Sequence, residues 1–117
     1  MRQDGCVSDP DQGFTVAPLA WVEADPDPTA LLLLEELSAD PEALAANFAE
    51  PLRFGTAGLR AERGVGPARM NRVTVRVAAR SIGRYLRSLG LTHKGVMIGF
   101  DGRPESDIYA SDSARLL

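Results

Sequence analysis

Residues 53–60 read Arg53-Phe54-Gly55-Thr56-Ala57-Gly58-Leu59-Arg60 and bring two glycines, a hydroxyl and two guanidinium groups into one short stretch. Glycine lets the backbone come close to a ligand, Thr56 can donate a hydroxyl hydrogen bond, and Arg60 can bind a phosphate with two N–H donors. A Gly-x-x-Gly pair by itself usually marks an ordinary turn, so these residue types alone favour a plain loop between a strand and a helix. The sequence on either side decides between the two interpretations.

The totals are those of one globular domain, with 117 residues of which 44% are hydrophobic and 25% charged. The longest apolar run, Ala30 to Leu34, is far short of the ~20 residues of a membrane-spanning helix, so no membrane partner is expected. Residues 1–5 lack the basic cluster and apolar run of a secretory signal, which predicts a cytoplasmic protein. A single cysteine, Cys6, agrees with a reducing compartment and is given no catalytic role.

Charge is distributed unevenly along the chain. Residues 1–50 carry 11 acidic and one basic residue, a net charge of −10, whereas residues 51–117 carry five acidic and 12 basic residues, a net charge of +7. Eleven of those 12 bases are arginine, which suits an anionic ligand that accepts planar, bidentate donors. The acidic first half and the lack of a reading motif with interleaved aromatics argue against nucleic acid, so phosphate is the expected anion.

The first half of the chain predicts a loose lead-in and two helices. Residues 1–20 show no clear period and are interrupted by Asp-Pro, Gly and Ser. A helix is expected over about 29–38 with Thr29 as its N-cap, and a second one from Pro41 to near Phe48 with Asp40 as its cap. On the first helix the residues expected to share the buried face are Leu31, Leu34 and Leu37.

The second half predicts two strands and two helices. A short strand around 52–54 and a long loop to residue 69 precede a helix over 72–89, which Gly90 is placed to end. An apolar strand at 95–100 and a helix over 105–117 capped by Ser106 follow. The apolar face expected on the 72–89 helix consists of Val75, Ala78, Ile82, Tyr85, Leu86 and Leu89.

This order of elements predicts an α/β fold, namely an incomplete three-layer α/β/α domain with a mostly parallel sheet. Only about two core strands are expected, whereas stable sheets usually have about four to six. Apolar surface on the last strand and helix is therefore expected to lack a partner.

Three groups of residues occur together in a recognisable order. They are Phe54-Gly55-Thr56-Ala57-Gly58-Leu59-Arg60, then Arg69-Met70-Asn71 with Thr74-Val75, then Gly99-Phe100-Asp101-Gly102-Arg103 with Ser106 and Tyr109-Ala110. This set resembles the first domain of the alpha-D-phosphohexomutase superfamily, which includes phosphoglucomutases, phosphomannomutases and phosphopentomutases. The resemblance covers residues 21–117 and implies a truncated first domain preceded by the lead-in at 1–20.

The resemblance implies a phosphosugar substrate and an intramolecular phosphoryl transfer. In the family a phosphoserine gives its phosphoryl group to a hexose or pentose phosphate, and the sugar bisphosphate reorients before it returns a phosphoryl group, with Mg²⁺ offsetting charge. By this resemblance Arg60 binds the substrate phosphate and lies beside the phosphoserine, while Thr56 and Gly58 shape its loop. Asp101 and Arg103 support the wall of the site, or equally form a structural pair or cap the last helix.

Several departures from the family pattern affect these expectations. Ala61 stands where the family commonly has glycine, so a positive φ there would strain the backbone and displace Arg60. Ala68 replaces a frequent asparagine. The 117 residues contain neither a Thr-Ala-Ser-His-Asn-Pro nucleophile loop nor an Asp-x-Asp-x-Asp-Arg metal loop, so no catalytic residue or metal ligand is assigned and the fragment is expected to be inactive alone. The serines judged unsuitable as substitute nucleophiles are Ser81, Ser88, Ser106, Ser111 and Ser113.

Two alternatives remain open beside the mutase fragment. One is a non-catalytic module that binds phosphate, another anion or an acidic partner, and the other is a decayed product that never folds stably. The isolated His93 is interpreted as a surface residue and Trp21 as an anchor for the first helices. A stripe of arginines on the 72–89 helix is interpreted as solvated charge, and its members are Arg72, Arg76, Arg80, Arg84 and Arg87.

Overall fold

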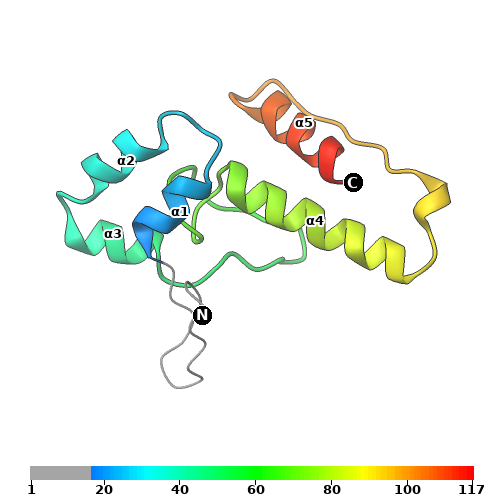
Figure 1. Cartoon of the computed structure of the whole chain (residues 1–117), viewed down its shortest axis with the longest axis horizontal. Coiled ribbons are helices and arrows are strands. Elements are labelled where there is room, and N and C mark those ends of the chain that lie inside the picture. The colour runs from blue at the N-terminus through cyan, green and yellow to red at the C-terminus, as the bar shows by residue number, and fades with distance from the viewer. Residues whose placement is uncertain (1–16) are drawn as a thin grey trace, which may run out of the picture. The chain divides into compact units, whose positions relative to one another are not determined.

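The computed structural model describes residues 17–117 and divides the chain into two compact units, one up to Val73 and one from Thr74 onward (Figure 1). Each unit is described by itself. Cys6 and most of the expected lead-in lie outside the described residues. The helices are α1 (Pro18–Ala24), α2 (Ala30–Leu37), α3 (Pro41–Asn47), α4 (Arg72–Ser88) and α5 (Ser106–Leu116), with a short 3₁₀ helix at Thr92–Lys94.

The predicted α/β sheet is wrong for the described chain, which is helical and contains no β-strand between residues 17 and 117. Only two isolated bridges occur, Gly55 with Gly58 and Arg63 with Met70. The segments 52–54 and 95–100, both predicted as strands, have no regular secondary structure. A strand is defined by hydrogen bonds to a neighbouring strand, and no described segment pairs with 95–100, where Met97 is 98% exposed. The apolar composition of 95–100 therefore indicates a segment suited to burial, but it does not by itself predict hydrogen bonding to another strand.

The first unit has a small hydrophobic core, made by α1 and α2 together with Val65 from the long loop. Trp21 packs against this core and meets the ring of Phe48 edge-on, with centroids 6.5 Å apart at 88°, which confirms its expected anchoring role. The prediction for Leu31 is wrong, because that side chain is 50% exposed. The buried face of α2 instead follows an i, i+4 spacing. The buried core residues are Val22, Ala30, Leu34 and Val65.

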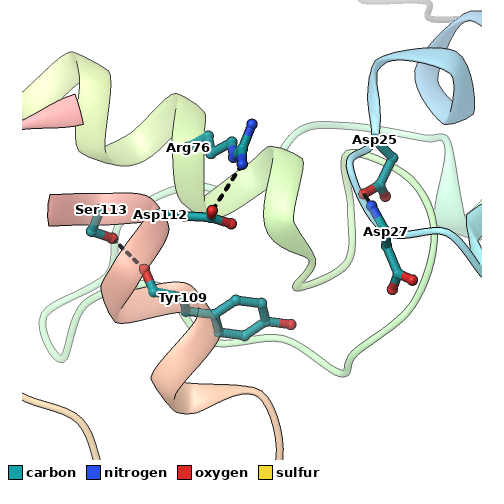
Figure 2. Close-up of polar contacts among 6 residues, drawn as sticks. All are labelled: Asp25, Asp27, Arg76, Tyr109, Asp112 and Ser113. Carbon is teal, nitrogen blue, oxygen red and sulfur yellow. Dashed lines mark hydrogen bonds and ion pairs between the residues drawn. The ribbon is translucent and has the colours of Figure 1, made fainter. Parts of the chain in front are cut away.

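The starts of α2 and α3 differ in how they are capped. Asp40 caps α3 as predicted, because its side chain accepts hydrogen bonds from the backbone N–H groups of Glu42 (3.1 Å) and Ala43 (3.2 Å). Thr29 precedes α2 but makes no capping bond, which corrects the prediction. Its N–H and hydroxyl donate instead to Asp27 Oδ1 at 2.9 and 2.8 Å. The backbone N–H of Asp27 in turn donates to Asp25 Oδ1 at 2.9 Å (Figure 2). Two aspartates thus shape the turn before α2.

In the second unit, α4 occupies the predicted range and ends as predicted at Gly90. That glycine has φ +70°, and the N–H groups of Gly90 and Leu91 donate to the carbonyls of Arg87 and Leu86, each at 3.0 Å. This pattern is a Schellman motif, which satisfies carbonyls at the end of a helix. No helix within residues 17–117 combines the length and apolar character needed to cross a bilayer.

Two other predictions for this unit need correction. Ser106 is the first residue of α5 and not its cap, since the preceding Glu105 takes that place with φ +71°. The expected apolar face of α4 is largely exposed, with Tyr85 64% and Leu89 52% accessible, while Thr74 and Ala79 are the buried residues of this helix. A 3.6-residue period shows which apolar residues share one face of α4, but it does not show which element packs against that face.

Candidate functional site

The glycine-rich stretch forms a tight turn. Gly55 and Gly58 exchange two backbone hydrogen bonds, from Gly55 N to Gly58 O at 3.0 Å and from Gly58 N to Gly55 O at 3.2 Å. Gly58 has φ +92°, a conformation that a residue with a Cβ adopts only with strain. No heavy atom lies within 4 Å of the position that a Cβ on Gly58 would take, so glycine is favoured here by backbone conformation alone.

Thr56 and Arg60 present their side chains to solvent from this turn and the residues after it. Both are exposed, and within residues 17–117 neither side chain makes a hydrogen bond or an ion pair with the protein. A guanidinium group without an acidic neighbour keeps its donors available for an external anion. The expected strain at Ala61 does not arise, because Glu105 is the only non-glycine residue in the described part with positive φ.

The loop that follows Arg60 is held in place by two buried asparagines. Asn71 donates from Nδ2 to the carbonyls of Gly64 (2.9 Å), Gly66 (2.8 Å) and Arg69 (3.2 Å). Asn47 donates from side-chain Nδ2 to Val65 O at 3.0 Å, and its backbone carbonyl oxygen accepts from the N–H of Ala68 at 3.1 Å. Because the amides satisfy carbonyls that would otherwise be buried without partners, they fix the shape of the loop.

Sequence reasoning missed this role of the asparagines. In the sequence, Asn71 stands out only as part of Arg69-Met70-Asn71, and Asn47 carries no signal. The cluster of Gly64, Gly66 and Pro67 was the available hint, since a loop with several breakers needs side-chain partners for its backbone.

Gly66 brings the loop against the end of α3. Its φ is +108°, and a Cβ placed on it would lie 2.3 Å from the carbonyl oxygen of Asn47 and 3.3 Å from Cδ2 of Phe48. Only glycine allows this approach. This close backbone approach therefore acts together with the hydrogen bonds of Asn47 and Asn71 to position the segment between Arg60 and α4.

In the second unit Asp101 and Arg103 are brought together. Arg103 Nε lies 3.0 Å from Asp101 Oδ2, and Asp101 Oδ1 accepts from the Arg103 N–H (3.1 Å) and from Ser106 Oγ (2.8 Å). The hydrogen bond from Ser106, followed by that from the Arg103 backbone, lowers the pKa of Asp101 below its ordinary value. The side chains are largely exposed, so the pair orients Arg103 more than it stabilises the fold.

A second polar group lies between α4 and α5 (Figure 2). Arg76 Nη2 lies 2.8 Å from Oδ1 of Asp112, whose residue is only 2% exposed. Arg76 therefore leaves the predicted solvated stripe and ties the two helices together. On the neighbouring turns of α5, the Tyr109 hydroxyl donates to Glu105 Oε2 at 3.1 Å, and the Ser113 hydroxyl donates to the Tyr109 carbonyl at 2.8 Å.

An open pocket of about 320 Å³ adjoins Asp101. Its lining comes from the end of the 95–100 segment and from α5, including Phe100, Ser106 and Tyr109. The pocket thus combines an aromatic wall with a carboxylate and hydroxyl groups. His93, predicted to be a surface residue, is exposed in the 3₁₀ helix.

The structure assembles the predicted site residues in two groups. Thr56, Gly58 and Arg60 belong to one loop of the first unit, and Asp101 with Arg103 belong to the second unit. Residues 17–117 contain no group of three or more His, Cys, Asp or Glu side chains that could hold a metal ion. The described residues therefore do not supply a set of ligands that fits Mg²⁺.

Comparison with known proteins places this sequence in a family. Residues 51–117, more than half of the chain, match the model for phosphoglucomutase/phosphomannomutase, alpha/beta/alpha domain I. The matched range begins just before the Gly55–Gly58 turn and includes all five predicted site residues. No solved structure matches the chain.

Curated relatives agree with this match. A phosphopentomutase from Mus musculus is 37% identical over 71% of the chain, and a probable phosphoribomutase from Schizosaccharomyces pombe is 37% identical over 77%. A phosphoglucomutase from Staphylococcus saprophyticus is 40% identical over 62% of the chain. The alignments cover 14%, 16% and 13% of these three relatives, so the chain corresponds to a small part of each. With its glycine turn, exposed Arg60 and Asp101–Arg103 pair all inside the matched range, the chain belongs to the phosphoglucomutase/phosphomannomutase family.

Proposed function

We propose that this chain supplies the phosphate-binding wall of a phosphosugar mutase site and binds a sugar phosphate. The observation that carries the proposal is Arg60, an exposed guanidinium without a protein partner in the described residues, placed two residues after the Gly55–Gly58 turn. It lies in the segment that matches the family. The names of the relatives, which are mutases of glucose and pentose phosphates, support a phosphosugar ligand.

The proposed reaction moves a phosphoryl group between C1 and C6 of a hexose phosphate, or between C1 and C5 of a pentose phosphate. A sugar hydroxyl oxygen attacks the phosphorus of a phosphoserine, the bond from phosphorus to the serine oxygen breaks, and the proton lost by the sugar hydroxyl is balanced by the proton that the serine oxygen gains. The resulting bisphosphate reorients and returns its other phosphoryl group to the serine. Such transfers depend on positioning and on stabilising charge at the phosphoryl oxygens.

The residues of this chain have binding roles in that scheme. Arg60 donates two N–H groups to non-bridging phosphate oxygens, which is the geometry that a guanidinium offers. Thr56 donates a hydroxyl to the same anion, and Gly58 keeps the backbone of the turn free of side-chain atoms. In the second unit, Asp101 orients the guanidinium of Arg103 through the 3.0 Å ion pair.

The binding role of Arg60 can be tested by titrating the 117-residue chain with glucose 1-phosphate and ribose 1-phosphate while following backbone amides by ¹H–¹⁵N NMR. We expect shifts at Thr56 and Gly58, and roughly tenfold weaker binding for Arg60→Gln, the loss of about one charge-assisted hydrogen bond. Arg53→Gln is the matched control, since Arg53 is an exposed arginine of the same segment whose nearest acid is Glu50 at 3.8 Å. Equal weakening by both variants, or no shift in the turn, contradicts the proposal.

Activity requires a separate measurement. We expect the purified 117-residue polypeptide to bind sugar phosphate without turnover, because none of its residues is assigned as the phosphorylated nucleophile. A coupled assay for conversion of glucose 1-phosphate to glucose 6-phosphate checks this expectation. Measurable conversion overturns it and requires a nucleophile within these residues. Binding without turnover, even when the remaining domains of a homologous mutase are added in trans, favours a non-catalytic anion-binding module instead.

A further inference from the structure

A second cationic site lies within the Thr74–Leu117 unit, apart from the residues assigned above. An open pocket of about 420 Å³ is formed by the last turns of α4 and the end of α5. Its lining contains four arginines and no acidic side chain. Within residues 17–117 none of the four makes an ion pair or a hydrogen bond through its side chain. The lining residues are Arg80, Gly83, Arg84, Arg87, Arg115 and Leu116.

The helical spacing brings three of these arginines to one side of α4. Arg80, Arg84 and Arg87 follow an i, i+4, i+7 pattern, which places them along one face over a length of roughly 10 Å. Arg115 comes from the last turn of α5 and lines the same pocket. Four guanidinium groups therefore surround one hollow from two helices.

Gly83 favours this arrangement. A Cβ on Gly83 would lie 3.3 Å from the carbonyl oxygen of Leu116, which is a tight contact, and 3.5 Å from Cδ2 of Leu117, which is an ordinary one. The absence of a side chain lets the end of α5 approach α4 and carry Arg115 into the group. Arg76 and Asp112, paired at 2.8 Å, also join these helices and leave the carboxylate of Asp112 engaged elsewhere.

Within the Thr74–Leu117 unit, no acidic side chain lines the pocket to balance its charge. The carbonyl end of α5 contributes about half a negative charge, and the α-carboxylate that the 117-residue polypeptide carries on Leu117 contributes at most one more. Four arginines exceed both together. Like charges this close repel one another, and an anion held among them relieves that repulsion.

We propose that this pocket binds a diphosphate group. Phosphate oxygens match the paired N–H donors of guanidinium groups, and the spread of roughly 10 Å along α4 exceeds the reach of one phosphate while suiting two linked ones. A nucleic acid fits less well, because the lining has no aromatic side chain on which bases could stack. The site is separate from Arg60 and does not rest on the mutase proposal.

The test is isothermal titration calorimetry of the 117-residue chain with sodium pyrophosphate at about 50 mM salt, where exposed charges are only partly screened. Inorganic phosphate, a nucleoside diphosphate and a single-stranded oligonucleotide are the comparison ligands. We expect pyrophosphate to bind at least about tenfold more tightly than phosphate. Tighter binding of the nucleoside diphosphate than of pyrophosphate identifies the nucleotide as the source of the group, and equal binding identifies free diphosphate; both support the site.

Variants locate the binding. Arg84→Gln with Arg115→Gln should weaken pyrophosphate binding about tenfold or more, whereas Lys94→Gln, an exposed residue outside the pocket lining, should change it less than about twofold. In the unmodified chain the amides of Gly83 and Leu116 should shift in ¹H–¹⁵N spectra, so the result stands even if the double variant does not fold.

Three outcomes overturn the proposal. Equal affinity for phosphate and pyrophosphate shows that four arginines do not act together. Preference for the oligonucleotide shows a general polyanion surface. An equal effect of Lys94→Gln and the double arginine variant shows that net charge, and not the pocket, determines binding.

Discussion

The contact between Gly66 and the end of α3 provides a quantitative test of how the loop after Arg60 is held. In Gly66→Ala the new Cβ meets the Asn47 carbonyl oxygen at 2.3 Å and its carbon at 3.0 Å, so backbone must move. A φ of +108° adds about 1–2 kcal/mol of strain for an L-residue, and forcing extra volume into a packed site costs about 1–3 kcal/mol. We expect unfolding free energy to fall by about 2–5 kcal/mol, a large part of the ~5–15 kcal/mol typical of a domain.

Two other glycines of the same unit separate these contributions. Gly58→Ala has the positive φ, +92°, but open space around the new methyl group, so it should cost only about 1–2 kcal/mol. Gly55→Ala has neither problem, since its nearest atom lies 3.7 Å away, and should be neutral or stabilising by about 0.4–1 kcal/mol. Urea unfolding followed by fluorescence of the single tryptophan, Trp21, reports on this unit. If Gly66→Ala costs no more than Gly58→Ala, the backbone contact does not hold the loop.

Two further predictions concern hydrogen bonds made by single side chains. Asp40→Ala removes both capping bonds to the first turn of α3 and should lower stability by about 1 kcal/mol in the same urea assay, whereas Thr29→Ala, at a helix start without a capping bond, should lower it less. Ser106→Ala should raise the pKa of Asp101 toward its ordinary 3.8, measured by ¹³C NMR titration of the carboxyl carbon. Because the folded-state pKa of Asp101 is lowered, its carboxylate stabilises the fold at pH above the unfolded pKa, and this contribution is lost as pH falls through the folded pKa. The Ser106→Ala variant should therefore lose less stability on acidification. An unchanged titration of Asp101 contradicts the role of Ser106.

Helices α2 to α5 were predictable because their signals are local, whereas α1 (Pro18–Ala24) was not expected. Asp40-Pro41 before α3 and Gly90 after α4 act through hydrogen bonds within a few residues, and each predicted boundary agrees with the structure to within a residue or two. The structure of the 95–100 segment, which was wrongly predicted as a strand, was not predictable in the same way. Its apolar run shows that the segment can be buried, but pairing depends on a second segment far away in sequence, and no described segment supplies one.

The same distinction applies to the candidate site. The turn at Gly55–Gly58 and the exposed Arg60 follow from residue types close together in sequence. The elements that position the next segment do not, because Asn47 donates to Val65, 18 residues away, and Gly66 is required by the backbone of Asn47. Neither contact leaves a pattern within a short window.

Charge on α4 shows why a helical stripe has no single meaning. Arg76 and Arg80 are one turn apart, yet the first is paired with buried Asp112 at 2.8 Å and the second faces an open pocket without an acidic partner in the described residues. The helical period places both arginines in one stripe. The position of α5 gives them different roles, because it pairs Arg76 with Asp112 and leaves Arg80 in the pocket proposed to bind a ligand. The residue that permits this approach is Gly83, whose role appears only when α5 is in place. A Gly83→Ala variant should therefore disturb pyrophosphate binding at Arg115 while leaving sugar-phosphate binding at Arg60 intact, and loss of both together would show that the two binding sites are not independent.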